Sequence, residues 1–290
     1  MRKTGRQMIG QTFVYMKSMR FWLAVLLFLF TCLLSEVSYY DGMQYQNDSI
    51  LELLFSRKWE AQMYENTAFS SYEILCNYDS SMWFSLLIIC IFSFPSVSAF
   101  MEEYYSGEYY FMISRMSVKA YSLMKFIAAG LTGMGVCLFG YLMFAGLVVL
   151  RFPNVRNYPE EYLAQNGIDL VRLFWQWANL LLTAALISMF VLLVAPFVRD
   201  MYFVFGLPML CSYLIFHIEV SVYRRNPDGM GLWHAVWGLV NLPRYSKLYL
   251  MFESLTGAAL IWFYLLLLLE ICAMFAVFFH VVKRRCRKNV

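Results

Sequence analysis

The feature that most constrains this chain is a series of long apolar runs. A helix needs about 20 apolar residues to cross the ~30 Å hydrocarbon core of a bilayer. Six runs reach that length in the 290-residue sequence, at residues 21 to 39, 82 to 101, 126 to 150, 175 to 196, 201 to 220 and 257 to 282. Because lipid offers no hydrogen-bond partner to the backbone, each run is expected to be helical. The sequence therefore predicts an all-α integral membrane protein of six transmembrane helices, folded as a single domain over residues 1 to 290.

The composition excludes several other classes of protein. The chain is 61% hydrophobic and 14% charged, whereas soluble domains are roughly half apolar and a quarter charged. Its net charge of +4 does not indicate a nucleic-acid partner, because the cations gather at the borders of the apolar runs, where they act as topology signals. The seven cysteines show neither a CxxC pair nor the spacing of metal ligands. We expect no metal site and no nucleic-acid interface.

The positions of lysine and arginine predict the orientation of the chain, since both are enriched in cytoplasmic loops. If the N-terminus is cytoplasmic, the inner side holds 14 of the 23 cations, namely Arg2, Lys3, Arg6, Lys17, Arg20, Arg115, Lys119, Lys125, Arg199, Lys283, Arg284, Arg285, Arg287 and Lys288. The outer loop of residues 40 to 81 then carries seven carboxylates against only Arg57 and Lys58. We therefore expect a multi-pass plasma membrane protein with cytoplasmic termini and a basic tail at residues 283 to 290.

Two segments are expected to lie at the membrane surface without crossing it. Within residues 1 to 20, apolar side chains recur at helical spacing beside polar ones, which predicts an amphipathic helix on the cytoplasmic side. That helix either contacts a cytoplasmic partner or only anchors the first span at the membrane surface. Residues 221 to 256 contain an apolar stretch with Trp233 and Trp237 that is too short to cross, which predicts a re-entrant or interfacial helix before the sixth span.

Glu270 lies near the middle of the last apolar run. An ionisable group in a span is costly and marks a functional candidate, here a residue that lines a translocation path or relays protons. A protonated carboxyl that is hydrogen-bonded to a neighbouring hydroxyl would stabilise helix packing instead. Both interpretations stay open at the level of the sequence.

The third apolar run is rich in glycine, with Gly130, Gly133, Gly135, Gly140 and Gly146. Small residues let helices approach closely in lipid. The run is therefore expected to be buried among other helices, either within one subunit or between two.

A short polar segment separates the second and third runs and is expected to be cytoplasmic. It covers residues 102 to 119 and carries two carboxylates, a glycine that permits a turn, a further carboxylate and two cations, namely Glu102, Glu103, Gly107, Glu108, Arg115 and Lys119. Such a segment is typical of a docking element for another protein. The Glu102 and Glu103 pair also occurs in the EExxxR motif of CAAX-processing proteases, but Gly107 stands where that motif requires arginine. Because the GxSxG, HExxH and P-loop motifs are absent as well, we do not expect an enzyme.

Taken together, these features resemble the permease of a type-2 ATP-binding-cassette exporter. The resemblance rests on six spans with cytoplasmic termini, an amphipathic N-terminal helix, and a second span that runs into the carboxylates of residues 102 to 108. Ser117, Tyr121 and Lys125 stand at the Ser-x-x-x-Tyr-x-x-x-Lys-like spacing with which the third span of that family begins.

The resemblance implies a division of labour between subunits. Two permease subunits, identical or different, would form the membrane path, and two separate ATPase subunits would bind ATP and magnesium, so this chain itself carries no cofactor. The docking segment would contain a coupling helix that enters a cleft on the ATPase, and the six residues named above would take part in that contact. Arg199 and Asp200, between the fourth and fifth runs, would make a second contact.

The cargo of such an exporter is less defined by the sequence. The outer loop is acidic and rich in aromatic residues, which favours cationic amphipathic molecules such as antimicrobial peptides or lipophilic drugs; polysaccharide and lipid-linked cargo are also compatible with it. The alternative hypothesis is a sensory or immunity membrane protein that binds a peptide or partner through this loop and transports nothing. Dependence on an ATPase distinguishes the two.

Overall fold

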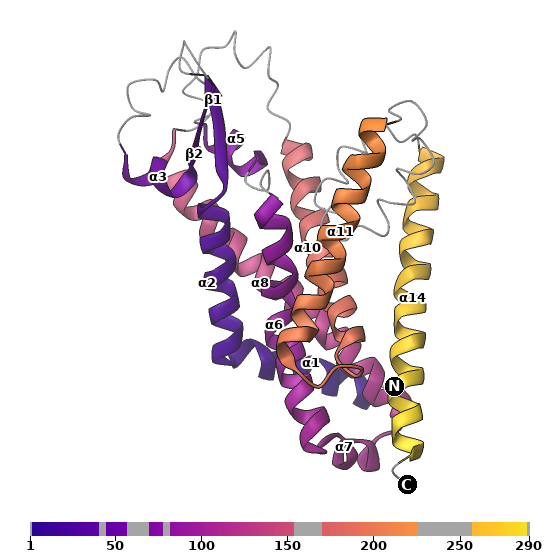
Figure 1. Ribbon diagram of the computed structural model, residues 1–290. Coiled ribbons are helices and arrows are strands. Elements are labelled where there is room, and N and C mark those ends of the chain that lie inside the picture. The colour runs from indigo at the N-terminus through magenta and orange to yellow at the C-terminus, as the bar shows by residue number, and fades with distance from the viewer. Residues whose placement is uncertain are drawn as a thin grey trace.

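The computed structural model describes residues 2–40, 45–56, 70–77, 82–153, 170–225 and 257–288. Helices make up most of these residues, together with one antiparallel hairpin (Figure 1). In chain order the elements are α1 (Arg2–Lys17), α2 (Met19–Leu33), β1 (Glu36–Tyr40), β2 (Tyr45–Ser49), α3 (Ile50–Phe55), α5 (Ser71–Asn77), α6 (Met82–Ser106), α7 (Tyr109–Arg115), α8 (Val118–Arg151), α10 (Leu170–Val194), α11 (Met201–Arg225) and α14 (Gly257–Lys288).

Three of the described helices are long and apolar enough to cross a membrane, which gives the chain the character of a membrane protein. They comprise Leu86–Ser106, Val118–Arg151 and Trp177–Val194, and a fourth candidate results if the bent pair of α1 and α2 is taken as one span. The predicted second, third and fourth spans coincide with these three helices. Helices α11 and α14 cover the predicted fifth and sixth runs, but a total of six spans remains a prediction.

The first predicted span is shorter than expected. Helix α2 ends at Leu33, and the apolar run continues into strand β1, which pairs with β2 in the register Glu36 to Ser49. The alternation of Val37 and tyrosines with polar residues suits a strand. The expectation of an all-helical chain and of a helix through residue 39 therefore missed a two-stranded hairpin that follows the C-terminal end of α2.

Helices α1 and α2 meet at a bend of 67°. The hydroxyl of Ser18 accepts a hydrogen bond from the backbone N–H of Phe21 and so caps α2, which is the preferred role of serine at a helix start. Helix α1 buries Thr12 and Tyr15, and it exposes Phe13, Val14 and Lys17 on its other side. The exposed side of α1 thus mixes apolar and charged residues, and its role as an interfacial helix stays a prediction.

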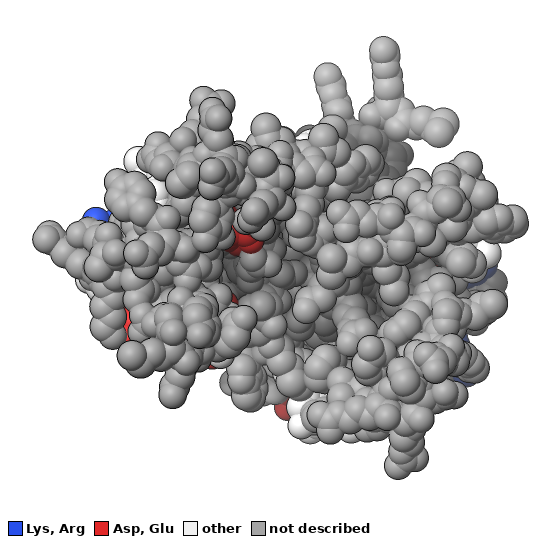
Figure 2. All heavy atoms as spheres, turned by 90° about the horizontal axis from the view of Figure 1, so that it is seen from above, with Lys and Arg blue, Asp and Glu red and all other residues white. Residues whose placement is uncertain are grey.

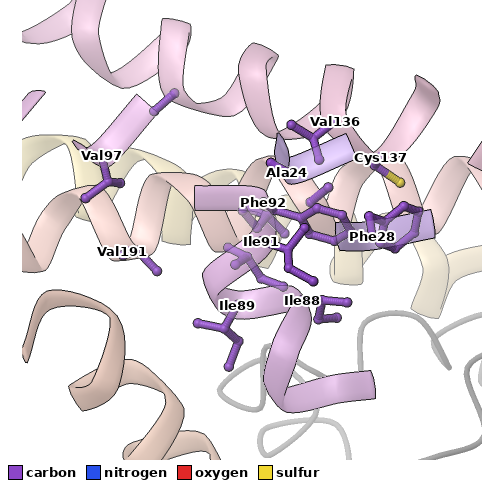
Figure 3. Packing of buried hydrophobic residues seen from close by; sticks show 14 of the residues in the cluster. Ala24, Phe28, Ile88, Ile89, Ile91, Phe92, Val97, Val136, Cys137 and Val191 are labelled. Atoms are coloured by element: carbon purple, nitrogen blue, oxygen red, sulfur yellow. The ribbon is translucent and has the colours of Figure 1, made fainter. Parts of the chain in front are cut away.

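Helix α8 lies at the centre of the bundle and contacts α1, α2, α6, α10 and α14. Figure 3 shows part of the core that it forms, where Phe28 of α2 packs near Phe92 of α6 and Val136 of α8. The rings of Phe28 and Phe92 lie 5.0 Å apart between centroids. Burial of such side chains and their close contacts fix the helices relative to one another.

The glycines of α8 are packed against helices of the same chain. A methyl group at Gly133 would lie 2.0 Å from the Ser188 hydroxyl and 2.6 Å from the Ala184 carbonyl oxygen, both on α10. At Gly140 it would lie 2.5 Å from the ring of Phe28 on α2. Gly146 has nothing within 4 Å of that position. Close approach within the subunit therefore accounts for most of the glycines in this run.

Two predicted regions lie largely or partly outside the described residues. Half of the predicted outer loop of residues 40 to 81 falls there, and so does most of the predicted re-entrant segment of residues 221 to 256, of which α11 covers only the start. Figure 2 looks onto the end of the molecule that carries the hairpin, and a few acidic and basic side chains of described residues are visible on it.

Candidate functional site at the α7 end

The docking segment predicted from the sequence contains a short helix at one end of the molecule. Helix α7 connects α6 to α8, and the last turns of α14 lie near the same end (Figure 1). Gly107 has a φ of +86°, a left-handed conformation that glycine adopts without the steric cost paid by other residues. Ser117 then caps α8 by accepting a hydrogen bond from the N–H of Ala120. Gly107 and Ser117 thus set the two turns that hold α7 across the end of the bundle.

Several side chains of this segment are available to a partner. Glu108, Arg115 and Lys119 are exposed, and the ring of Phe111 on α7 is 74% exposed. Tyr109 on the opposite side of α7 is buried, and this burial raises the pKa of its hydroxyl. Helix α7 therefore combines a buried side with an exposed side that carries an aromatic ring and a cation, and an exposed carboxylate directly precedes it.

Glu103 does not face solvent as a docking carboxylate would; it belongs to a buried ion pair. Its partner is Lys125 of α8, whose side chain is 1% exposed. Tyr121 donates a hydrogen bond of 2.8 Å to the other oxygen of Glu103. Lys125 also donates to the hydroxyl of Tyr15 on α1 at 3.0 Å and lies within 6 Å of both tyrosine rings. A buried charge needs such partners, and these four residues join α1, α6 and α8.

Glu102 forms an ion pair with Arg20, which lies at the start of α2, just after the bend between α1 and α2. The two terminal nitrogens of Arg20 donate to its two oxygens at 2.9 and 2.5 Å. The side chain of Glu102 is 66% exposed and that of Arg20 is 38% exposed. Solvent therefore screens this pair, and its contribution to stability is small. The bidentate geometry of the pair nevertheless fixes the orientation of the start of α2 relative to the end of α6.

The second predicted contact lies in the turn between α10 and α11. Pro196 lacks an N–H and ends α10 soon after Val194. The side chain of Asp200 accepts a hydrogen bond of 2.8 Å from the N–H of Tyr202, which makes it the cap of α11. Arg199 and Asp200 are both exposed. Asp200 thus has a local role that the sequence analysis did not assign, and Arg199 remains available.

Glu270 lies away from this group of charges. It is half-buried in α14 and precedes Arg285 by 15 residues, which corresponds to about 22 Å along a helix. Its role in a translocation path stays a prediction. Within the part of the chain that the structure describes, no group of three or more metal-ligating side chains occurs.

The structure brings several residues into the site that sequence reasoning did not select for it. They are Tyr15, whose hydroxyl contacts Lys125, together with Arg20, Tyr105 and Arg285. The helical spacing of apolar residues in an amphipathic segment gives no sign of such contacts between distant helices. The available signal was the high density of tyrosine in residues 104 to 110, next to the end of an apolar run.

Comparison of the chain with models of protein families, with curated proteins and with solved structures found no match.

Proposed function

We propose that this chain is the membrane-spanning permease subunit of a type-2 ATP-binding-cassette exporter, which lies in the plasma membrane with α7 and both termini in the cytoplasm. ATP hydrolysis with magnesium belongs to a separate ATPase subunit, so the chain itself is not an enzyme. The observation that carries the proposal is α7, a short helix between two long apolar helices. Its exposed side chains include Phe111 and Arg115, and the exposed Glu108 directly precedes it.

The chemistry of α7 suits a cleft on a soluble protein. Aromatic residues and arginine supply much of the binding energy where proteins meet, provided that they enter a pocket from which water is excluded. Phe111 offers such an anchor, and the charges of Glu108 and Arg115 give the contact its orientation. Lys119 and Arg199 extend the charged surface beside it.

The buried ion pair supports a coupling role for the same helix. Because Glu103 on α6 is bound to Lys125 on α8, the two helices that flank α7 are linked at their ends. A displacement of α7 by the ATPase is then passed to both helices together. Nucleotide binding favours the closed arrangement of the ATPase pair, and the membrane helices follow that change of population.

The remaining parts of the proposal concern cargo and assembly. A second permease subunit, a copy of this chain or a different one, completes the path through the membrane. The cargo favoured by the acidic, aromatic outer loop is a cationic peptide or an amphipathic drug. Glu270 is the candidate residue for lining the path.

Co-expression tests the proposal directly. The chain is tagged and produced together with an ATPase of the Walker type encoded in the neighbouring reading frame, and ATP turnover is measured in lipid with and without cationic peptides. Retention of the ATPase and turnover stimulated by peptide are expected. If no ATPase is retained and turnover stays at background, the exporter is excluded and a non-transporting sensory or immunity protein becomes the better account.

A pair of phenylalanines tests the role of α7. Phe111→Ala removes the proposed anchor and is expected to weaken ATPase binding about tenfold or more. Phe55→Ala is the matched control, because Phe55 is 83% exposed on the short helix α3 near the hairpin. Both variants are measured by titration of the ATPase onto permease in nanodiscs. Equal binding by the two variants would contradict docking through α7.

A further inference from the structure

Tyr105 links two connections that are far apart in the sequence. It lies at the end of α6, and its hydroxyl donates a hydrogen bond of 3.0 Å to the carbonyl of Val198 in the turn between α10 and α11. The carbonyls of Ala195 and Pro196 lie 3.3 and 3.5 Å from the same hydroxyl. One side chain of the docking segment is therefore surrounded by the backbone of the turn that carries Arg199.

The turn needs such a donor. Carbonyl groups at and beyond a helix end have no N–H of a following turn to bind them, and Pro196 removes one more N–H from this stretch. An unpaired backbone carbonyl in a half-buried position is costly. The hydroxyl of Tyr105 supplies the donor that the local sequence lacks, and it does so from another helix.

Arg285 of α14 holds the tyrosine from its other side. The centre of its guanidinium lies 5.1 Å from the ring centroid of Tyr105 and 4.5 Å from that of Tyr104. The two rings lie edge to face with their centroids 5.4 Å apart. Contacts of this kind between a cation and aromatic faces are favourable, more so where water is excluded. The end of α14 is thereby attached to the end of α6.

We infer that Tyr105 is a positioning residue, which holds the turn of residues 195 to 200 beside α7 so that the two connections present one preassembled docking surface. The inference rests on the proposed function, because the partner of that surface is the ATPase. Arg285 restrains the ring of Tyr105 and thus includes the last helix in the same unit. Preassembly lowers the entropy lost when the partner binds.

Tyr105→Phe tests the inference, because it removes the hydroxyl and keeps the ring that Arg285 contacts. Tyr202→Phe is the matched control, since Tyr202 lies just after the same turn and is 86% exposed. The first measurement is amide hydrogen exchange of the full chain in nanodiscs without any ATPase. We expect exchange in a peptide covering residues 195 to 203 to rise about three- to tenfold in Tyr105→Phe, as the loss of one hydrogen bond implies. Peptides from α8 should not change.

The second measurement adds the ATPase from the neighbouring reading frame. Tyr105→Phe is expected to weaken its binding severalfold, while the apparent KM for ATP of the complexes that do form stays the same, because nucleotide binds to the ATPase. Tyr202→Phe should resemble the parent chain in both measurements. Arg285→Gln should accelerate exchange in the same peptide by loosening the ring of Tyr105.

The two measurements separate the inference from the proposed function. Unchanged exchange of the turn in Tyr105→Phe, or an equal rise in Tyr202→Phe, overturns the positioning role. Faster exchange with unchanged ATPase binding overturns the role of the turn in docking. Faster exchange in a protein that retains no ATPase at all supports the contact and overturns the exporter.

Discussion

At the scale of single residues, Lys125 shows how the protein keeps a charge buried. Its ammonium group has Glu103 and Tyr15 as partners, so removal of the lysine leaves a mostly buried carboxylate with the hydrogen bond from Tyr121 but without a countercharge. Lys125→Met is therefore expected to lower the free energy of unfolding by about 3 to 5 kcal/mol. The measurement is thermal or denaturant unfolding in mild detergent, and the exposed Lys119→Met serves as control.

A double variant gives the sharper test of this pair. Replacing both partners, with Lys125→Met and Glu103→Gln together, removes the uncompensated charge, and most of the lost stability is expected to return. If the double variant were less stable than Lys125→Met alone, the carboxylate would not depend on the lysine, and the assignment of the pair would be wrong.

Glu102 poses a different question, namely whether it acts on a partner directly or through Arg20. Both of its oxygens accept hydrogen bonds from Arg20. Glu102→Lys places two cations against each other and is expected to uncouple transport from ATP hydrolysis. The exchanged pair, Arg20→Glu with Glu102→Lys, restores an attractive contact and should recover at least half of the coupling. Coupling is measured as ATP turnover stimulated by peptide. If the double variant recovered no more coupling than Glu102→Lys alone, Glu102 would be expected to contact the ATPase directly.

At the scale of elements, the packing of α8 against α10 depends on Gly133. A methyl group there meets a backbone oxygen that cannot move away without displacing the helix. Gly133→Ala is expected to cost about 1 to 3 kcal/mol of stability. Gly146→Ala, where the space is open, should be neutral or stabilising by up to about 1 kcal/mol, because alanine favours a helix. Unfolding midpoints of both variants in the same detergent compare them, and equal losses would contradict the close contact.

The sequence predicts the helices of this protein better than their contacts. The apolar runs locate α6, α8 and α10 because hydropathy over 20 residues is a local property. The hairpin was missed because apolar residues recur at Val37 and Tyr39 after the run, although Ser35, Glu36 and Ser38 interrupt it. Average hydropathy alone does not distinguish such a strand from the end of a helix.

The spacing of residues in the sequence could not predict the ion pairs near α7. The sequence indicates Lys125 as a cation at the border of a span and Glu103, 22 residues earlier, as a docking carboxylate. Their pairing requires that α6 and α8 be antiparallel neighbours in a particular register, which is a property of the folded bundle. Glu108, Arg115 and Lys119 are exposed, and their role in coupling remains a prediction.

At the scale of the whole molecule, the charges and the fold favour the same orientation. Side chains of Lys17, Arg115, Lys119, Arg199 and Arg284 come from five separate connections or helix ends, and α7 and the end of α14 lie at one end of the bundle (Figure 1). Cations collect on the cytoplasmic side of membrane proteins. The hairpin with its carboxylates Glu36 and Asp48 lies at the other end. We therefore expect the α7 end in the cytoplasm, where an ATPase can reach it.

Labelling of single cysteines in intact cells tests that orientation. In a background with the seven native cysteines replaced by alanine, Asn47→Cys on β2 and Lys119→Cys at the start of α8 place exposed thiols at opposite ends. A maleimide that cannot cross the membrane should label the first within minutes and leave the second unlabelled until the cells are permeabilised. Because binding of a cytoplasmic ATPase requires α7 on the inner side, the reverse pattern would exclude docking through α7. Labelling of both thiols in intact cells would show that the two ends do not lie on opposite sides of the membrane.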